Sequence, residues 1–221
     1  MLFRSDLILL DWNGTLLDDV ALCVDALNRL LRRYGYPQQY DLDTYRDIFG
    51  FPVEEYYVRA GFDFSRHPFP VLAESYMQDY LPHSAACPLA QGAREALEAF
   101  RTAGLRQVVL SASPADTLAH QVTQRGIRPY FDELLGLSDI YARSKVAIGL
   151  AYLQRSGFAP ERCVMIGDSV HDAEVAQALG VRCALLCSGH QSEAALKAAG
   201  APVYPDLPEA AAGILRQAQA Q

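Results

Sequence analysis

The sequence has no long apolar run, no excess of basic residues and no zinc-type spacing of cysteine and histidine. Its first apolar block, residues 7–10, is bounded by Asp6 and Asp11. The block is too short for a signal peptide and far below the about 20 residues that a membrane helix needs. The net charge of −7 gives no basic surface for nucleic acid. We therefore expect neither a membrane nor a nucleic acid as partner, and a cytoplasmic location.

Cysteines are few, and none forms a CxxC pair. An odd, scattered set is typical of a reducing compartment rather than of a disulfide framework. The composition, 51% apolar and 20% charged, is that of a globular protein. A chain of 221 residues is long enough for one large domain or for a core with a smaller unit attached. The five cysteines are Cys23, Cys87, Cys163, Cys183 and Cys187.

The segment from about residue 17 to residue 86 carries helical patterns and no strand signal. Apolar residues recur at helical spacing over 20–34, with Gly35 as a stop, and shorter patterns cover 42–49 and 53–60. A turn-rich break leads into a further helix over 71–80, and residues 82–88 have the composition of a linker. We expect this segment to be an all-helical insertion.

From residue 93 onward, helices and strands alternate. Alternation of this kind predicts βαβ units and a parallel sheet covered on both faces. The fold class is therefore α/β, a Rossmann-like parallel sheet with helices on both faces and an inserted all-helical cap. We expect a core domain at 1–16 and 87–221 and a cap domain at 17–86. The expected strands are 105–110, 134–137, 163–166, 182–186 and 203–204, and the expected helices are 93–102, 116–125, 144–156, 169–179, 192–199 and 208–217.

Asp11 directly follows the apolar residues 7–10, which read as a buried strand. Open α/β sheets place their chemistry at the carboxyl ends of the strands. An unpaired buried charge is costly, so this position favours a nucleophile or a metal ligand. The structural alternative is an aspartate that caps the turn before Gly14. Asn13 followed by Gly14 fits a tight turn with positive φ.

A second strand, residues 163–166, also runs into an aspartate, Asp168. Two strands that each present a carboxylate make an oxygen-only divalent site of the kind that Mg²⁺ occupies. Asp172 lies three residues after Ser169, and this spacing also resembles a helix capping box. The capping alternative accounts for Asp172 but not for Asp168.

Ser111 and Lys145 are weak signals when each is taken alone. Serine after a strand is usually a helix cap, and lysine in a first helical turn is usually solvated, with Arg143 as a competitor. Together they supply a neutral and a cationic donor for an anion. His171 is expected at the surface, and His190 has no partner spacing that assigns it a role.

Taken in order, these motifs resemble those of the haloacid dehalogenase-like hydrolase superfamily, and most closely its phosphoglycolate-phosphatase-like branch with a helical cap. The first motif stands here as DWNGTLLD at 11–18, and the fourth as GDSVHD at 167–172. The second is a strand that ends in Ser111, and the third is Lys145 at the start of a helix. The resemblance covers the whole chain and includes the cap inserted after the first motif.

The resemblance implies a Mg²⁺-dependent phosphatase of a small phosphorylated metabolite. Asp11 would attack phosphorus and form an aspartyl-phosphate, which splits one hard displacement into two. The implied catalytic residues are Asp11, Asn13 and Lys145. The implied metal ligands are Asp11, the backbone carbonyl of Asn13, Asp168 and Asp172. The implied substrate contacts are Thr15, Ser111, Ala112 and Lys145. The chain is expected to be a monomer or a homodimer.

Asn13 departs from the family pattern. The family's phosphatases carry an aspartate there that protonates the leaving alcohol and then activates water, and an amide has no proton to give in the useful pH range. Such assistance is worth about 10²- to 10⁴-fold, with Asp18 or a cap residue as a replacement acid. The alternative is a weak or inactive module that binds a phosphorylated ligand. A haloacid dehalogenase also lacks this aspartate, but the acidic pair Asp168 and Asp172 argues against it.

Overall fold

The computed structural model describes residues 5–138, 140–141 and 145–219. Its six strands form one sheet in the order β3-β2-β1-β4-β5-β6, with every pairing parallel. β1 is central, and its first residue, Leu7, pairs with Arg106 on one side and Cys163 on the other. The strands are β1 Leu7–Leu10, β2 Arg106–Pro114, β3 Glu133–Leu137, β4 Cys163–Gly167, β5 Arg182–Leu186 and β6 Val203–Tyr204.

Helices cover both faces of this sheet because its strands are apolar on both sides. Ile8 and Leu10 of β1 pack into a cluster with α5, α6 and α10, whereas Leu7 and Leu9 pack into a second cluster with α7 and α8. The predicted α/β fold is therefore confirmed. The core helices are α5 Ala93–Thr102, α6 Ala115–Gln124, α7 Val146–Ser156, α8 Val170–Leu179, α9 Glu193–Ala198 and α10 Leu207–Gln219, with short 3₁₀ turns at Arg128–Tyr130 and Pro160–Arg162.

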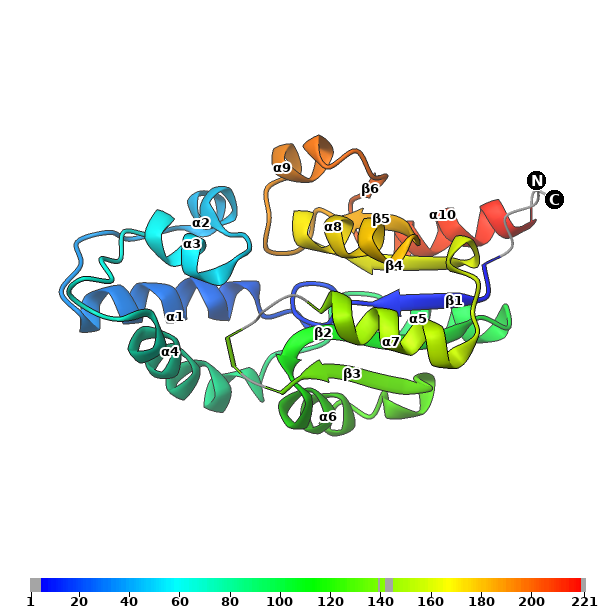
Figure 1. The fold of residues 1–221 in the computed structure, drawn as a ribbon, viewed down its shortest axis with the longest axis horizontal. Helices are drawn as coiled ribbons and strands as arrows, with labels where there is room; N and C mark the ends of the chain where they lie inside the picture. Colours follow the sequence, from blue (N-terminus) through cyan, green and yellow to red (C-terminus); the bar gives the residue numbers. More distant parts are fainter. Residues whose placement is uncertain (1–4, 139, 142–144, 220–221) are drawn as a thin grey trace.

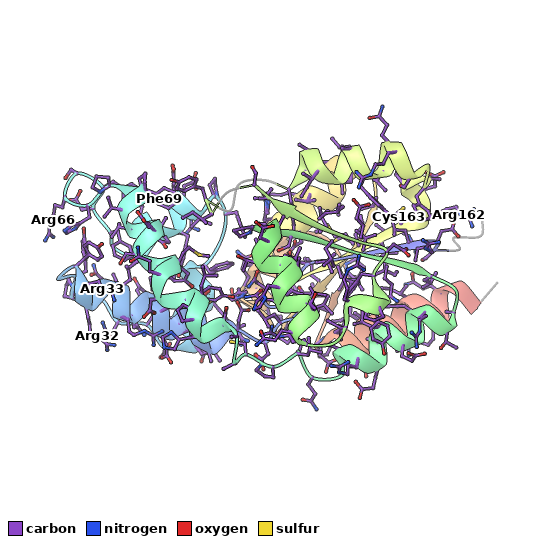
Figure 2. The ribbon with its side chains drawn as sticks, turned by 90° about the horizontal axis from the view of Figure 1, so that it is seen from below. Arg32, Arg33, Arg66, Phe69, Arg162 and Cys163 are labelled. Atoms are coloured by element: carbon purple, nitrogen blue, oxygen red, sulfur yellow. The ribbon has the colours of Figure 1, made fainter. Side chains whose placement is uncertain are left out.

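Four helices follow β1 and form a separate block beside the sheet (Figure 1). They have their own apolar cluster, which draws its fully buried members from residues 20–80. In Figure 2, Phe69 lies in this block, while Cys163 at the start of β4 lies at the opposite end of the molecule. The carboxyl ends of the strands therefore point toward the block. Its helices are α1 Val20–Arg33, α2 Leu42–Ile48, α3 Val53–Arg59 and α4 Phe69–Ser84.

Two expected boundaries are wrong. The helix expected over 71–80 runs from Phe69 to Ser84, so the first three residues of the expected linker, including Pro82, are helical. Proline disfavours a helix interior, and the helix ends two residues later. The strand expected over 105–110 continues to Pro114, so Ser111 lies inside β2 rather than after it. The proposed domain boundaries at residues 16 and 86 stay a prediction. Among the described residues, no helix is both long and apolar enough to span a membrane.

Candidate active site

Asp11 lies one residue beyond β1, between the ends of β2 and β4. Its backbone N–H donates to the carbonyl of Ile166 at 2.9 Å, which fixes it at this edge of the sheet. Its carboxylate accepts a short hydrogen bond from the ammonium of Lys145, and the same ammonium lies 2.7 Å from Asp172. The side chain of Lys145 is 2% exposed. A single buried cation thus joins two carboxylates that come from distant parts of the sequence.

Asp172 makes the capping contact that the sequence suggested, and its role as a metal ligand stays a prediction. Its Oδ2 accepts from the backbone N–H of Asp168 at 3.1 Å, and from the N–H and hydroxyl of Ser169 at 3.0 and 2.7 Å. These bonds complete the expected capping box at the start of α8. The other oxygen, Oδ1, makes the ion pair with Lys145. The cap therefore holds the carboxylate in position while leaving one oxygen directed at the site.

Asp168 is held between the turn at Gly14 and the turn at Gly189, just before His190. Its Oδ2 accepts from the backbone N–H of His190 at 2.6 Å, and its Oδ1 accepts from the hydroxyl of Thr15 at 3.3 Å. Gly14 has φ +71°, and a Cβ there would lie 2.3 Å from Oδ2 of Asp168. Only glycine combines this conformation with so close an approach. The expected positive φ at Gly14 is confirmed, and it lets the turn after Asp11 pack against the second carboxylate.

Three carboxylates, those of Asp11, Asp168 and Asp172, offer oxygens within 4.8 Å of one another. Burial raises the pKa of Asp11 to about 8; Lys145 opposes the rise, and the other two carboxylates add to it. Burial also raises the pKa of Asp168 to about 6, against the effect of His190. The site thus carries more negative charge than Lys145 neutralises. An all-oxygen set with a deficit of positive charge fits a hard divalent cation such as Mg²⁺.

These groups line one cavity of about 170 Å³ between the sheet edge and the helical block. Of the predicted site residues, the cavity contains Asp11, Asn13, Ser111, Ala112, Lys145, Asp168 and Asp172. Thr15 is fully buried and is absent from the lining, and its hydroxyl binds Asp168 instead. Thr15 therefore lies behind the second carboxylate, and its predicted contact with substrate stays a prediction. Arg143 and Ser144 lie outside the described residues.

Asn13 is held by hydrogen bonds on both ends of its amide. The hydroxyl of Ser113 donates to its Oδ1 at 2.7 Å. Its Nδ2 donates to Oδ2 of Asp19 at 2.7 Å and to the hydroxyl of Tyr80 at 2.8 Å. Two donated bonds use both protons of the amide nitrogen. The amide is therefore directed toward Asp19, on the side of the helical block.

Asp19 and His190 are a buried acid–base pair at the site that the sequence did not single out. Asp18, the replacement acid suggested by the sequence, is exposed, while Asp19 is 1% exposed and also accepts from Tyr80 at 2.7 Å. Although burial acts to raise it, His190 holds the pKa of Asp19 below its ordinary value. Burial acts to lower the pKa of His190, but Asp19 makes the net shift upward. Their position in the sequence could have indicated them, because both residues follow strands of the sheet at its carboxyl edge.

His171 is not at the surface, contrary to expectation. Its side chain is 10% exposed and lines the cavity, and its ring stacks on Phe51 with centroids 4.5 Å apart. On the other side of the site, Phe49 stacks on His190 at 4.9 Å. Arg46 of α2 donates to the carbonyls of Gly189 and Ser188 at 2.9 and 3.0 Å. The helical block is therefore docked onto the core around the cavity mouth by rings and hydrogen bonds.

Comparison with known proteins identifies the family. Residues 8–186 match the sequence model of the haloacid dehalogenase-like hydrolases. The chain belongs to this family. It is 25% identical over 202 residues to a probable phosphoglycolate phosphatase of Pseudomonas putida, covering 88% of this chain and 77% of that protein. With such relatives, it falls in the phosphoglycolate-phosphatase-like branch of the haloacid dehalogenase-like hydrolases.

Proteins similar to this chain carry the names of more than one activity. The chain is 32% identical over 178 residues to the tyrosine-protein kinase PtkA of Mycobacterium tuberculosis, covering 79% of this chain and 60% of the kinase. The chain thus spans about 60% of the length of that relative. The crystal structure of a predicted phosphatase from Clostridium acetobutylicum has a TM-score of 0.83 at 21% identity, covering 96% of this chain and 99% of the other. That likeness shows the shared fold.

Proposed function

We propose that this chain is a Mg²⁺-dependent phosphatase that hydrolyses a small phosphorylated molecule through an aspartyl-phosphate on Asp11. The observation that carries the proposal is the position of the Asp11 carboxylate. It ends the central strand, lines the cavity and pairs with the buried Lys145. Membership of the haloacid dehalogenase-like hydrolases and similarity to phosphoglycolate phosphatases support the same reaction class.

In this mechanism, Asp11 attacks the phosphorus atom and the ester oxygen leaves with its bonding electrons. Lys145 orients the Asp11 carboxylate and lies where it can hold a phosphoryl oxygen, and Ser111 and Ala112 line the wall beside it. Donors fixed in advance stabilise the charge that spreads over these oxygens in a loose transition state. Mg²⁺, held by Asp11, Asp168 and the backbone carbonyl of Asn13 with Asp172 behind them, would screen the repulsion between the anionic nucleophile and the phosphate.

The second candidate function is a module that binds a phosphorylated ligand and turns it over slowly or not at all. Asn13 is the specific observation that favours it. The two protons of its amide nitrogen are donated to Asp19 and Tyr80, so neither reaches a leaving oxygen. The intact pair of Asp11 and Lys145 favours the enzyme, because a binding module has less need of a nucleophile.

A labelling experiment tests the proposal. Wild type is incubated with ³²P-labelled acetyl phosphate and Mg²⁺, quenched in acid, and treated with hydroxylamine, which cleaves acyl phosphates. We expect hydroxylamine-labile label on the protein and release of inorganic phosphate in wild type, and neither in Asp11→Asn. Asp18→Asn is the matched control, since Asp18 is an exposed aspartate of the same segment. Label or hydrolysis that persists in Asp11→Asn would refute the nucleophile, and their absence from wild type favours the binding module.

A further inference from the structure

The wall of the cavity opposite the phosphate site is built from aromatic rings. The core side of the cavity holds the charged groups described above, whereas the lining from the helical block is mostly apolar, with Asp19, Cys23 and the hydroxyls of its tyrosines as the polar groups. A cavity with one ionic end and one apolar end fits a ligand divided in the same way. The rings that line the apolar end include Phe49, Tyr56, Tyr57, Phe69, Tyr76 and Tyr80.

These rings contact one another around the cavity instead of filling it. Tyr76 stacks on Tyr80 with centroids 5.9 Å apart and an interplanar angle of 11°. Tyr57 meets Phe69 edge-to-face at 5.4 Å. The hydroxyl of Tyr80 is bonded to Asp19 at 2.7 Å, so this residue presents its ring to the cavity while its polar end is occupied. Packing of this kind holds the rings in position to receive another ring edge-to-face or offset.

The same wall offers little to a second anionic group on the substrate. Among the described lining residues, Lys145 is the only lysine or arginine, and it is paired with Asp11 and Asp172. A carboxylate on the organic part of the substrate would meet mainly rings there, with tyrosine hydroxyls and two histidines in place of a free lysine or arginine. Much of its hydration would then be lost without a full positive charge in exchange, which is costly. The described lining thus disfavours a small metabolite that carries a carboxylate beside its phosphate.

Asn13 independently narrows the class of leaving group. With an amide at this position, and with the suggested replacement acid Asp18 exposed, the departing oxygen leaves as an anion. An alkoxide is about as basic as hydroxide, whose conjugate acid, water, has a pKa of about 15.7. A phenolate is far less basic, because the pKa of a phenol is about 10. A phenolic oxygen can therefore leave where an alkyl oxygen needs a proton that the bonded Asn13 amide does not supply.

We propose that the substrate is an aryl phosphate, a phosphate monoester of a phenolic hydroxyl whose ring lies among the aromatic side chains of the helical block. This inference rests on the proposed function and names its substrate class. In the first step an oxygen of Asp11 forms a bond to phosphorus, and the electron pair of the ester bond leaves on the phenolate oxygen. Water then adds to phosphorus and frees Asp11. The proton that water loses ends on the phenolate, so the products are a phenol and hydrogen phosphate.

The size of the cavity sets a limit on the organic group. An apolar cavity of about 150 Å³ binds one benzene molecule, and the cavity here measures about 170 Å³. Because this volume also includes the phosphate end, it leaves room for at most a single ring. A fused ring system exceeds it unless the helical block moves.

A panel of substrates tests the leaving group and the aromatic wall separately. Wild type is assayed with Mg²⁺ on phenyl phosphate, benzyl phosphate, ethyl phosphate and 2-phosphoglycolate, with Asp11→Asn as the blank. Benzyl phosphate keeps the ring but has an alkyl leaving oxygen. We expect kcat to be at least 100-fold higher for phenyl than for benzyl phosphate, because a general acid contributes about 10²- to 10⁴-fold to alkyl esters. We expect KM to be at least tenfold lower for benzyl phosphate than for ethyl phosphate.

A variant of the wall tests the position of the ring. Tyr76 is half-buried and lies outside the charged groups of the site. Tyr76→Leu should raise KM for phenyl phosphate about two- to tenfold, the worth of an aromatic pair, and leave KM for ethyl phosphate within twofold. Tyr76→Phe keeps the ring and should behave as wild type. If Tyr76→Leu changes KM equally for phenyl phosphate and ethyl phosphate, the predicted ring position is overturned. The same holds if Tyr76→Leu changes only kcat.

The outcomes also separate this inference from the proposed function. Asp11-dependent hydrolysis that is fastest with 2-phosphoglycolate or ethyl phosphate, or equal for phenyl and benzyl phosphate, overturns the inference and leaves the phosphatase standing. If no ester is hydrolysed, the proposed function fails, and aryl phosphate hydrolysis fails with it. In that case thermal shifts with phenylphosphonate and phosphonoacetate still report on the cavity, since weaker binding of phenylphosphonate overturns the assignment of the wall.

Discussion

Replacing Asn13 by aspartate should add a further dependence on pH to the stability of the protein. In wild type, the amide nitrogen of Asn13 donates to Asp19 at 2.7 Å. In Asn13→Asp, a carboxylate oxygen takes the place of that nitrogen and faces the buried carboxylate of Asp19, which is 1% exposed. Tyr80 bonds both residues, but one hydroxyl proton serves only one of them. The variant therefore gains an uncompensated repulsion and not simply a catalytic acid.

The size of the repulsion follows from the geometry. Two charges about 4 Å apart at an effective dielectric constant of about 20 interact by about 4 kcal/mol. At about 1.36 kcal/mol per unit, this raises the pKa of the new carboxyl from about 3.9 to about 7. The unfolded chain releases this proton above about pH 4, whereas the folded chain keeps it until about pH 7. The unfolding free energy of Asn13→Asp should therefore fall as pH rises through this window, by up to about 4 kcal/mol.

Urea unfolding between pH 4.5 and pH 8, in EDTA so that no metal contributes, measures the effect. The matched background is Asp19→Asn, in which an amide again faces the carboxyl at position 13. In that background, the decrease in unfolding free energy caused by Asn13→Asp should change by less than about 1 kcal/mol between pH 4.5 and pH 8. A double-mutant cycle measures this difference. If the unfolding free energies of Asn13→Asp and wild type change with pH in parallel, the predicted repulsion between positions 13 and 19 is refuted.

Three further perturbations have outcomes that the structure specifies. Gly14→Ala should lower the unfolding free energy by at least about 1–2 kcal/mol and abolish Mg²⁺ binding, because its Cβ would meet Asp168. The control is Gly35→Ala: this glycine also has a positive φ, +74°, but open space around it, so the variant should show the conformational cost alone. Lys145→Met should cost about 3–5 kcal/mol in urea unfolding, because it leaves buried carboxylates unpaired. Mg²⁺ should raise the melting temperature of wild type but not of Asp168→Asn, and EDTA should abolish hydrolysis; an equal shift in both proteins would refute the metal site.

The sequence predicts the two strands that carry the aspartates well, because each is a short apolar run ended by a glycine or a polar residue. Leu7–Leu10 and Cys163–Gly167 are buried throughout, so their pattern carries the fold without help from tertiary contacts. The capping box of Ser169 and Asp172 is local for the same reason, and it is confirmed. The role of Lys145, the third motif, was harder to predict from the sequence. Nothing local to Lys145 shows that its ammonium reaches Asp11, 134 residues away in the sequence.

The environment of Asn13 could not be derived from the sequence. Asp18 and Asp19 are adjacent, and no periodicity indicates which of them is buried; the structure exposes the first and buries the second. His190 and Tyr80 reach Asp19 from 171 and 61 residues away. His171 was assigned to the surface because the helical block that covers it is invisible to a local pattern. Residues whose roles depend on contacts between the sheet and the block are the ones that sequence reasoning missed.

The central place of β1 in the sheet has a consequence for how the chain folds during its synthesis. Leu7–Leu10 pairs only with Arg106–Val109 and Cys163–Ile166. At about 5–20 residues per second, the strand waits about 5–20 s for its first partner and longer for its second. In that interval residues 20–80 emerge, with an apolar cluster of their own to close. The strand that carries Asp11 is thus an exposed apolar edge while the helices after it collapse, and a chaperone that binds short apolar segments has its best target there.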